Sequence, residues 1–398
     1  MMRELSPIDL SDPDALLALS RRTAPAGVLS IYVGADAGAD PGLRGAAIDL
    51  KNRLAELERN VTAEGPRERT MALRQGLERL DPEIRRLTSP EESGRGRALF
   101  APLGEGEGEA IRFASRMPLA TRVVLDAGAF IHPLLELLDE GRPAGVVLVS
   151  QDEARVLEWR LGELRPLERL EPEATEAPHE RPGPIGSSPS ERARTPKREQ
   201  RQAREHEGAR RFLEQVQEAA ARLGDRHGWE RILVSGGDRL TDPLADALSA
   251  PHGAEVVRDP RVLTQLDEAS LSAALTEQLR SAYAEYEARL VRDAREAGLG
   301  PGAAALGLSE VVGALNEGRV AHLLYDPAVR YAGAVGADGR LHAGEELRAA
   351  VGGVVDEPRL TERLVERALE TGARVTPVEG AAAGALAEAA GVAALLRW

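Results

Sequence analysis

Residues 145–170 read GVVLVSQDEARVLEWRLGELRPLERL, and this stretch decides the fold class. Its first residues form a continuous apolar run that is typical of a central strand. Residues 152–153 then predict a turn, and residues 154–159 and 163–170 predict a β-hairpin. Two strands that follow a buried strand so tightly predict a mixed sheet rather than a simple βαβ unit.

A long segment without apolar periodicity follows the hairpin. Residues 171–199 contain six prolines, and structureless loops longer than about 12–15 residues inside a domain are usually functional or disordered. We therefore expect residues 171–190 to be disordered in the free protein and to be cut first in limited proteolysis. The helix predicted after this segment has one apolar face, formed by Phe212, Leu213, Val216, Ala219, Ala220 and Leu223.

Strands and helices also alternate on the N-terminal side of this region. Apolar residues recur every three or four positions over residues 43–61 and 73–87, which predicts two helices that pack as an antiparallel hairpin. Around them, apolar runs predict strands at residues 28–33, 97–101 and 122–125.

On the C-terminal side, a strand at residues 231–237 and a long helix at 271–290 complete the middle of the chain. Beyond the glycine-rich break at residues 298–302, helices and strands alternate again. The predicted elements are helix 308–315, strand 320–326, helix 360–370, strand 374–378, helix 384–390 and strand 392–398.

The whole pattern predicts an α/β protein of three domains. The breaks are Gly141-Arg142-Pro143 and residues 298–302. The predicted domains are an N-terminal α/β domain with a helical hairpin (1–141), a mixed-sheet middle domain with a basic loop at 171–200 (142–298), and a C-terminal α/β/α sandwich (299–398).

Composition excludes several classes of protein. The chain has 398 residues and no cysteine, which excludes disulfides, zinc fingers and thiol catalysis. No apolar run approaches the roughly 18–20 residues of a membrane span, and the N-terminus lacks the apolar core of a signal peptide. We expect a soluble, cytoplasmic protein that does not bind membranes.

A basic segment stands out within an acidic chain. Residues 181–211 hold nine Lys/Arg against four Asp/Glu, whereas the net charge of the chain is −14. The acidic total argues against general nucleic-acid or DNA binding, and a solvated loop is one interpretation of the basic segment. Cations at a helix N-terminus oppose the helix dipole, so an anion such as an RNA phosphate nearby is the other. The predicted RNA contacts are Arg192, Arg194, Lys197, Arg198, Arg201 and Arg204.

No catalytic, metal or nucleotide motif is found in the sequence. None of the seven histidines has an H-x-x-x-H or H-E-x-x-H neighbour, and His322 is predicted to be a hydrogen-bonded core histidine. Ser235 lacks the Gly-x-Ser-x-Gly elbow. Gly236 and Gly237 lack both phosphate-loop patterns and predict a strand-to-helix turn instead. We expect no metal and no cofactor.

The order of these parts resembles the archaeal and eukaryotic class-1 peptide release factors and their relative Pelota. It is most similar to the bacterial branch of that superfamily, which includes the Vms/Ankzf-type peptidyl-tRNA hydrolases and the hibernation factor Balon. The stretches that carry the resemblance are Val28–Val33, Gly96–Ala101, Val146–Val149 with Ala154–Val156, Ile232–Gly236, Gly307–Val311 with Ala314, Leu315 and Gly318, and Gly391–Arg397.

The resemblance implies a ribonuclease-H-like middle domain and a C-terminal domain of the kink-turn-binding ribosomal protein type. It also implies a molecule that mimics a tRNA in the ribosomal A site. The implied partners are the ribosome, through ribosomal RNA and peptidyl-tRNA, and a translational GTPase such as EF-Tu.

The chain differs from this family in the motifs that the family uses for catalysis and for stop-codon recognition. Members that hydrolyse peptidyl-tRNA have Gly-Gly-Gln, or a variant that keeps Gly and Gln, in the middle-domain loop. The equivalent loop here reads RPGPIGSSPSER over residues 181–192 and contains no glutamine. The nearest glutamines, Gln200 and Gln202, are the candidate catalytic residues. The Asn-Ile-Lys-Ser stop-codon loop is also missing. The predicted loop tip comprises Gly183, Gly186, Ser187 and Ser188.

Three hypotheses follow. The first is a non-enzymatic hibernation or rescue factor that docks in the A site without codon-specific termination. The second is a peptidyl-tRNA hydrolase that uses Gln200 or Gln202 after a rearrangement. The third is an acidic adaptor that binds another protein, away from the ribosome, through its third domain.

Overall fold

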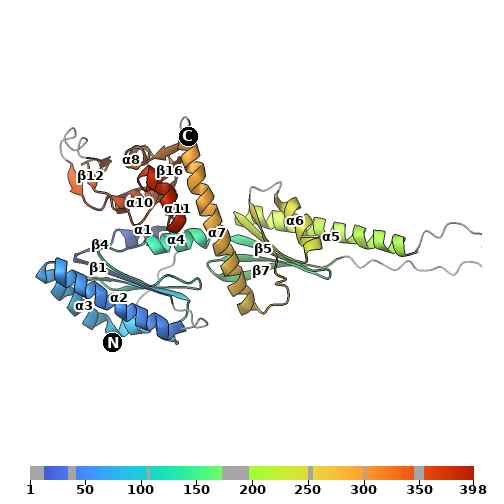
Figure 1. Cartoon of the computed structure of the whole chain (residues 1–398), viewed down its shortest axis with the longest axis horizontal. Coiled ribbons are helices and arrows are strands. Elements are labelled where there is room, and N and C mark those ends of the chain that lie inside the picture. Colours follow the sequence, from blue (N-terminus) through green and yellow to red (C-terminus); the bar gives the residue numbers. More distant parts are fainter. Residues whose placement is uncertain are drawn as a thin grey trace, which may run out of the picture. The chain divides into compact units, whose positions relative to one another are not determined.

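The computed structural model describes residues 13–34, 42–104, 108–172, 197–249, 254–298, 300, 303–344 and 354–398; for residues 197–205 it describes the backbone only. The chain divides into two compact units. The first combines Met1–Gly141 with Arg280–Trp398, and the second is Arg142–Leu279. Figure 1 colours the elements of both along the sequence.

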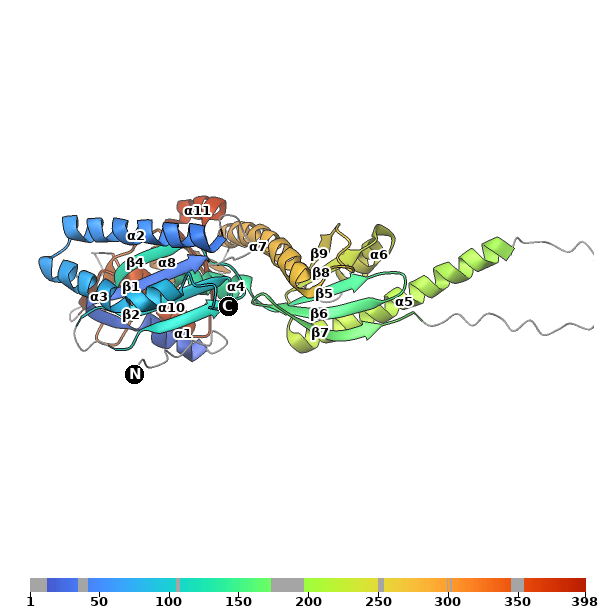
Figure 2. The ribbon, with the colours of Figure 1, turned by 90° about the horizontal axis from the view of Figure 1, so that it is seen from below.

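The N-terminal part of the first unit is an antiparallel sheet with the strand order β3-β2-β1-β4. The apolar stripes of two helices cover one face, where Leu29, Leu73 and Leu99 are fully buried. Figure 2 shows both helices running along this sheet. The elements are α1 (Pro13–Ser20), β1 (Thr23–Gly34), α2 (Gly42–Glu64), α3 (Arg67–Arg86), β2 (Gly96–Pro102), β3 (Ile111–Ser115), β4 (Arg122–Gly128) and α4 (His132–Glu140).

The C-terminal part of this unit is a sheet with the order β10-β16-β11-β15, beside a small sheet β13-β12-β14. Helices α8 and α10 contact β11 of the larger sheet, and Leu290 of α7 and Leu386 of α11 share a core with Leu324 of β11. The elements are β10 (Ala304–Leu306), α8 (Leu308–Asn316), β11 (Val320–Tyr325), β12 (Gly333–Val335), β13 (Leu341–Ala343), β14 (Val355–Glu357), α10 (Leu360–Glu370), β15 (Arg374–Pro377), α11 (Gly380–Leu386), a 3-10 turn (Ala387–Ala389) and β16 (Val392–Leu396).

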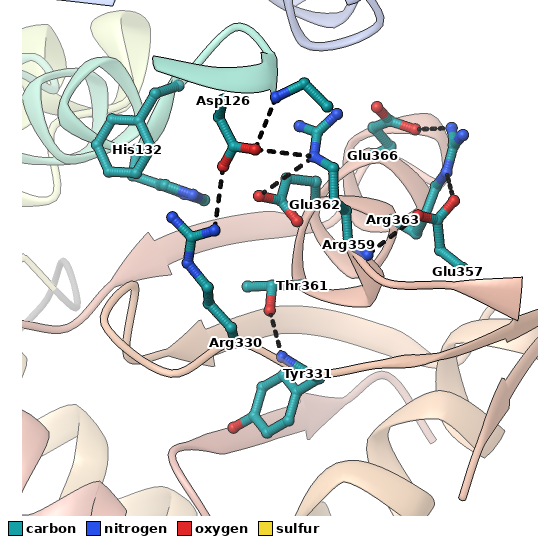
Figure 3. A network of polar contacts seen from close by, with 12 residues as sticks. Asp126, His132, Arg330, Tyr331, Glu357, Arg359, Thr361, Glu362, Arg363 and Glu366 are labelled. Carbon is teal, nitrogen blue, oxygen red and sulfur yellow. Dashed lines mark hydrogen bonds and ion pairs between the residues drawn. The ribbon is translucent and has the colours of Figure 1, made fainter. Parts of the chain in front are cut away.

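Charged side chains connect these two parts of the first unit. Figure 3 shows Asp126 at the end of β4, where it forms ion pairs with Arg330 at 3.4 Å and with Arg359 at 4.0 Å. Arg359 also pairs with Glu362 of α10 at 3.7 Å. His132 lies beside this network, and burial, followed by the positive charge of Arg359, lowers its pKa to about 4. His132 is therefore neutral, and its Nδ1 is hydrogen-bonded to the hydroxyl of Tyr325.

The second unit is a five-stranded sheet with the order β7-β6-β5-β8-β9. Helices α5 and α6 share one core with it, in which Val147, Val216 and Leu248 are fully buried. The first half of α7 contacts the sheet through a hydrogen bond of 3.3 Å from Trp159 Nε1 to Thr276 Oγ1. The elements are β5 (Ala144–Val149), β6 (Ala154–Arg160), β7 (Glu163–Leu170), α5 (Lys197–His227), β8 (Arg231–Gly236), α6 (Asp238–Ser249), β9 (Glu255–Asp259) and α7 (Glu268–Gly298).

The mixed sheet predicted from residues 145–170 is confirmed. Strand β5 pairs antiparallel with β6 and parallel with β8, which makes it the central strand. One predicted helix was misplaced: α11 begins at Gly380 and ends at Leu386, whereas the sequence predicted a helix over residues 384–390. The alternation of Gly and Ala there gives no apolar stripe that would fix its start.

Among the described residues, no helix is both long and apolar enough to cross a membrane. The α/β class predicted from the sequence is confirmed as several separate sheets with helices packed against them. The division into three domains stays a prediction.

Candidate nucleic-acid interface

The predicted basic loop joins two elements of the second unit. Strand β7, which precedes the loop, is an edge strand, and its last residue Leu170 is paired with Ala154. Helix α5, which follows the loop, begins at Lys197 and first reaches the core at Phe212. At 1.5 Å per residue, the helix before Phe212 is roughly 22 Å long. Figure 2 shows these first turns extending past the strands of the sheet.

The predicted RNA-binding residues fall into two groups. Arg192 and Arg194 lie outside the described residues, as do the loop-tip residues Gly183, Gly186, Ser187 and Ser188. The other four are in the first turns of α5, although their side chains also lie outside what is described. Positions 197, 201 and 204 follow one another at intervals of four and three, the spacing of neighbours on one helix face. The fourth residue is Arg198.

The two candidate catalytic glutamines also lie in α5. Gln200 and Gln202 have helical backbones. A Gly-Gly-Gln motif instead depends on glycine for a backbone conformation that other residues rarely adopt. The position of the two glutamines in a regular helix is thus different from that of a glutamine in a glycine loop.

Further along α5, cations are matched by carboxylates of the same helix. Glu207 forms ion pairs with Arg210 at 2.9 Å and with Arg211 at 3.2 Å, and Arg210 also pairs with Glu214 at 2.9 Å. Hydrogen bonds from both arginines hold the pKa of Glu207 below its ordinary value. The excess of positive charge on α5 therefore lies before Glu205.

The second half of α5 is held firmly to the sheet, through contacts that the sequence did not reveal. Arg222 pairs with Glu168 of β7 at 2.6 Å. Trp229, just after the helix, donates a hydrogen bond to Glu158 at 3.3 Å, and its ring lies over Gly145 so closely that a Cβ there would be 2.3 Å from a ring atom. The glycine at the start of the apolar run was the only sign of this contact in the sequence.

The described residues contain no group of three or more His, Cys, Asp or Glu side chains that could hold a metal ion. Two of the described histidines are instead engaged by other side chains. The interpretation of His322 as a core histidine is confirmed, because it is buried and its Nε2 lies 2.7 Å from the hydroxyl of Thr376. His227 lies 2.9 Å from Glu158 at the end of α5.

A comparison with protein families identifies the segment that carries this site. Residues 130–283 match bacterial archaeo-eukaryotic release factor family 10. The matched segment contains the whole mixed sheet, the basic loop and α5. The predicted resemblance to the bacterial branch of the release-factor superfamily is confirmed for this segment. A comparison with curated proteins finds no match.

Three solved structures are similar to this chain at low sequence identity and low TM-score. The archaeal translation termination factor aRF1 is 17% identical, with 98% of this chain and 99% of that chain covered and a TM-score of 0.26. Pelota from Archaeoglobus fulgidus is 14% identical, with 100% and 97% covered and a TM-score of 0.33. Dom34 from S. cerevisiae is 12% identical, with 76% and 80% covered and a TM-score of 0.37.

Proposed function

We propose that this protein is a ribosome-associated translation factor of release-factor architecture. The observation that carries the proposal is the match of residues 130–283 to a bacterial release-factor family. That segment also contains the one strongly basic stretch of an acidic chain. A local excess of positive charge is suited to phosphate contacts that give affinity without sequence specificity.

Within this proposal, the protein occupies the A site as a tRNA mimic during hibernation or rescue. Its middle domain is of the ribonuclease-H-like type and its C-terminal domain of the kink-turn-binding ribosomal protein type. Codon-specific termination is not part of the proposal, because the stop-codon loop of the family is missing. A translational GTPase such as EF-Tu is the second partner that this architecture implies.

Peptide hydrolysis is left out of the proposed activity for a structural reason. The loop at residues 181–192 has no glutamine, and Gln200 and Gln202 are both in regular helix. An enzyme of this family would need a backbone and side chain that together position a water molecule and stabilise developing charge.

Ribosome co-sedimentation at increasing salt tests the proposal. The wild-type protein should sediment with ribosomes, and binding should weaken steeply as the salt concentration rises. Substitution of Arg198, Arg201 and Arg204 by Ala should lower the affinity and reduce the slope of log K against log salt by about 2. The matched control is Arg210→Ala with Arg211→Ala, since both arginines are already paired with Glu207.

The control should keep the wild-type salt slope. A triple variant with the wild-type slope would move the RNA contact away from α5. A wild-type protein that stays in the supernatant would favour the adaptor hypothesis, in which the C-terminal domain binds another protein.

A further inference from the structure

Helix α4 of the first unit is buried to an unusual extent. Seven of its nine residues are buried, among them the charged residues Asp139 and Glu140, whereas a surface helix buries a single stripe. On one side α4 contacts β15 of the C-terminal part. Just before the helix, the N–H of Phe130 donates a hydrogen bond of 3.0 Å to Ser30 of β1 in the N-terminal part. The segment that leads into α4 and the helix itself therefore contact both parts of the unit (Figure 1).

A row of ring contacts runs through the same place. Tyr32 of β1 packs edge-on against Phe100 of β2, and its hydroxyl donates a hydrogen bond to the carbonyl of Phe130. The ring of Phe130 lies 4.6 Å from that of His132, which in turn lies 5.4 Å from the ring of Tyr325 in β11. All of these residues except Phe130 are at most 4% exposed. The row leads without a break from the N-terminal sheet to the C-terminal sheet.

Buried polar groups join the same two parts. Asp139 of α4 is 3% exposed and accepts hydrogen bonds from Arg374 and Thr376 of β15 and from Tyr283 of α7. The guanidinium of Arg374 also lies over the ring of Tyr286. Six of the nine Phe and Tyr residues of the chain are thus gathered at this contact. Because aromatic side chains dominate the energetics of cores, the contact resembles a core rather than the polar interface of two separable domains.

The N-terminal sheet has two covered faces, and the contact lies on one of them. Leu29 and Ile31 of β1 pack with α2 and α3. Side chains alternate along a strand, so Val28, Ser30 and Tyr32 point to the opposite face, where they are fully buried as well. Separation of the C-terminal part would expose the groups of α4 that face β15, and would weaken the layer that covers this second face.

We propose that the N-terminal and C-terminal parts of the first unit, which the whole second unit separates in sequence, unfold as a single cooperative body joined by this aromatic and polar contact. The second unit is then an insertion that unfolds separately, and the three predicted domains behave as two. A partner that binds either end of the chain stabilises both ends, because it binds only the folded state of the joint body. The inference does not depend on the proposed function.

Hydrogen exchange of the full-length protein, under conditions where the rate reports the opening equilibrium, tests the proposal. Leu315 is buried in α8, which packs on β10, β11 and β16 of the C-terminal part. Leu315→Ala creates a cavity there and should raise the opening constant of the slowest amides of β11 at least about 30-fold. The slowest amides of β1 in the N-terminal part should change by the same factor. Leu73→Ala, in the core under α3, should produce the reciprocal effect on β11.

A variant at the contact itself should act on both parts at once. Tyr325→Phe removes only the hydroxyl that is hydrogen-bonded to His132 Nδ1. Loss of this partner in a buried site should raise the opening constants of β1 and β11 equally, by about 5- to 100-fold.

Leu244→Ala is the matched control, since Leu244 is as deeply buried as Leu315 but belongs to the core of the second unit. It should accelerate exchange in β8 and leave β1 and β11 unchanged. Circular dichroism of each variant checks its folded content. A Leu315→Ala protein in which β11 exchanges faster while β1 keeps its wild-type rates would overturn the proposal, and so would one that loses the C-terminal part but retains a folded N-terminal part. Loss of both parts together, with β8 still protected, would support it.

Discussion

Arg374 and the basic start of α5 place the same kind of cation in opposite settings. Arg374 is 17% exposed, and its guanidinium lies 2.6 Å from the buried carboxylate of Asp139 and over the ring of Tyr286. Positions 197–204 of α5 instead hold four cations and one glutamate, on turns that precede the first core residue of the helix. Cations of the first kind hold the protein together, whereas those of the second kind form a local excess of positive charge in the sequence.

This difference lies in pairing rather than in composition. Residues 205–214 of α5 hold two arginines, and both are paired: Glu207 engages Arg210 and Arg211, and Glu214 also engages Arg210. A count of charges therefore overstates the length of the predicted RNA-binding segment. That segment ends where the ion pairs of Glu207 begin.

The largest loss of stability is expected when the buried ion pair of Arg374 with Asp139 is removed. Asp139→Ala removes the acceptor shared by Arg374, Tyr283 and Thr376 and leaves Arg374 largely buried without this partner. Loss of one partner of a buried ion pair costs about 3–5 kcal/mol. Chemical denaturation should show a loss of this size for the first unit. Asp152→Ala, at an exposed turn, is the control; equal stability of the two variants would contradict the buried network.

A smaller loss of stability is expected near the C-terminal end of α5, where Trp229 packs against the sheet. A Cβ at residue 145 would lie 2.3 Å from the ring of Trp229, which is itself buried. Gly145→Ala must therefore displace the ring, and overpacking of this kind costs about 1–3 kcal/mol. Gly237→Ala, where a Cβ meets nothing within 4 Å, should be near neutral. If Gly145→Ala unfolds at the wild-type denaturant concentration, Trp229 is not the anchor of this end.

The elements of the fold and the Gly145–Trp229 contact show what the sequence could and could not predict. The central strand and the helices α2 and α3 were predicted because long apolar runs and stripes set their own register. The strands β9, β10, β12, β13 and β14 were missed because three to five residues are too short to show a periodicity. The contact of Gly145 with Trp229 joins residues far apart in the chain, so no local pattern could reveal it.

Some features of the candidate site were likewise predicted from the sequence, and others were not. The six predicted RNA contacts came from a local excess of charge, which the sequence displays directly. Glu207 and Glu214 lie three or four residues from Arg210 and Arg211, a helical spacing that a count of charges ignores, and the structure shows the resulting ion pairs at 3.2 Å or less.

A stabilising change is expected at the tip of the hairpin on which α5 packs. Leu161 has a φ of 49° and Gly162 a φ of 81°, so both turn residues are left-handed. Such two-residue turns favour Asn-Gly, and a left-handed conformation costs most residues about 1–2 kcal/mol. Leu161→Asn should therefore raise the free energy of unfolding of the second unit by about 0.5–1 kcal/mol. A loss of stability would show that the leucine side chain contributes more by packing than its backbone costs.

The smallest effect is expected at the basic loop and the start of α5, where the predicted catalytic residues lie. Gln200 and Gln202 have helical backbones, and the loop at residues 181–192 offers only Ser187, Ser188 and Ser190 as hydroxyl groups. No histidine follows these serines in the loop to act as a base. Purified protein should release little or no peptide from stalled ribosome complexes, and Gln200→Ala and Gln202→Ala should match the wild type. Robust release that disappears in either variant would instead require the start of α5 to unwind on the ribosome, and would make its glutamine, rather than its arginines, the residue on which function depends.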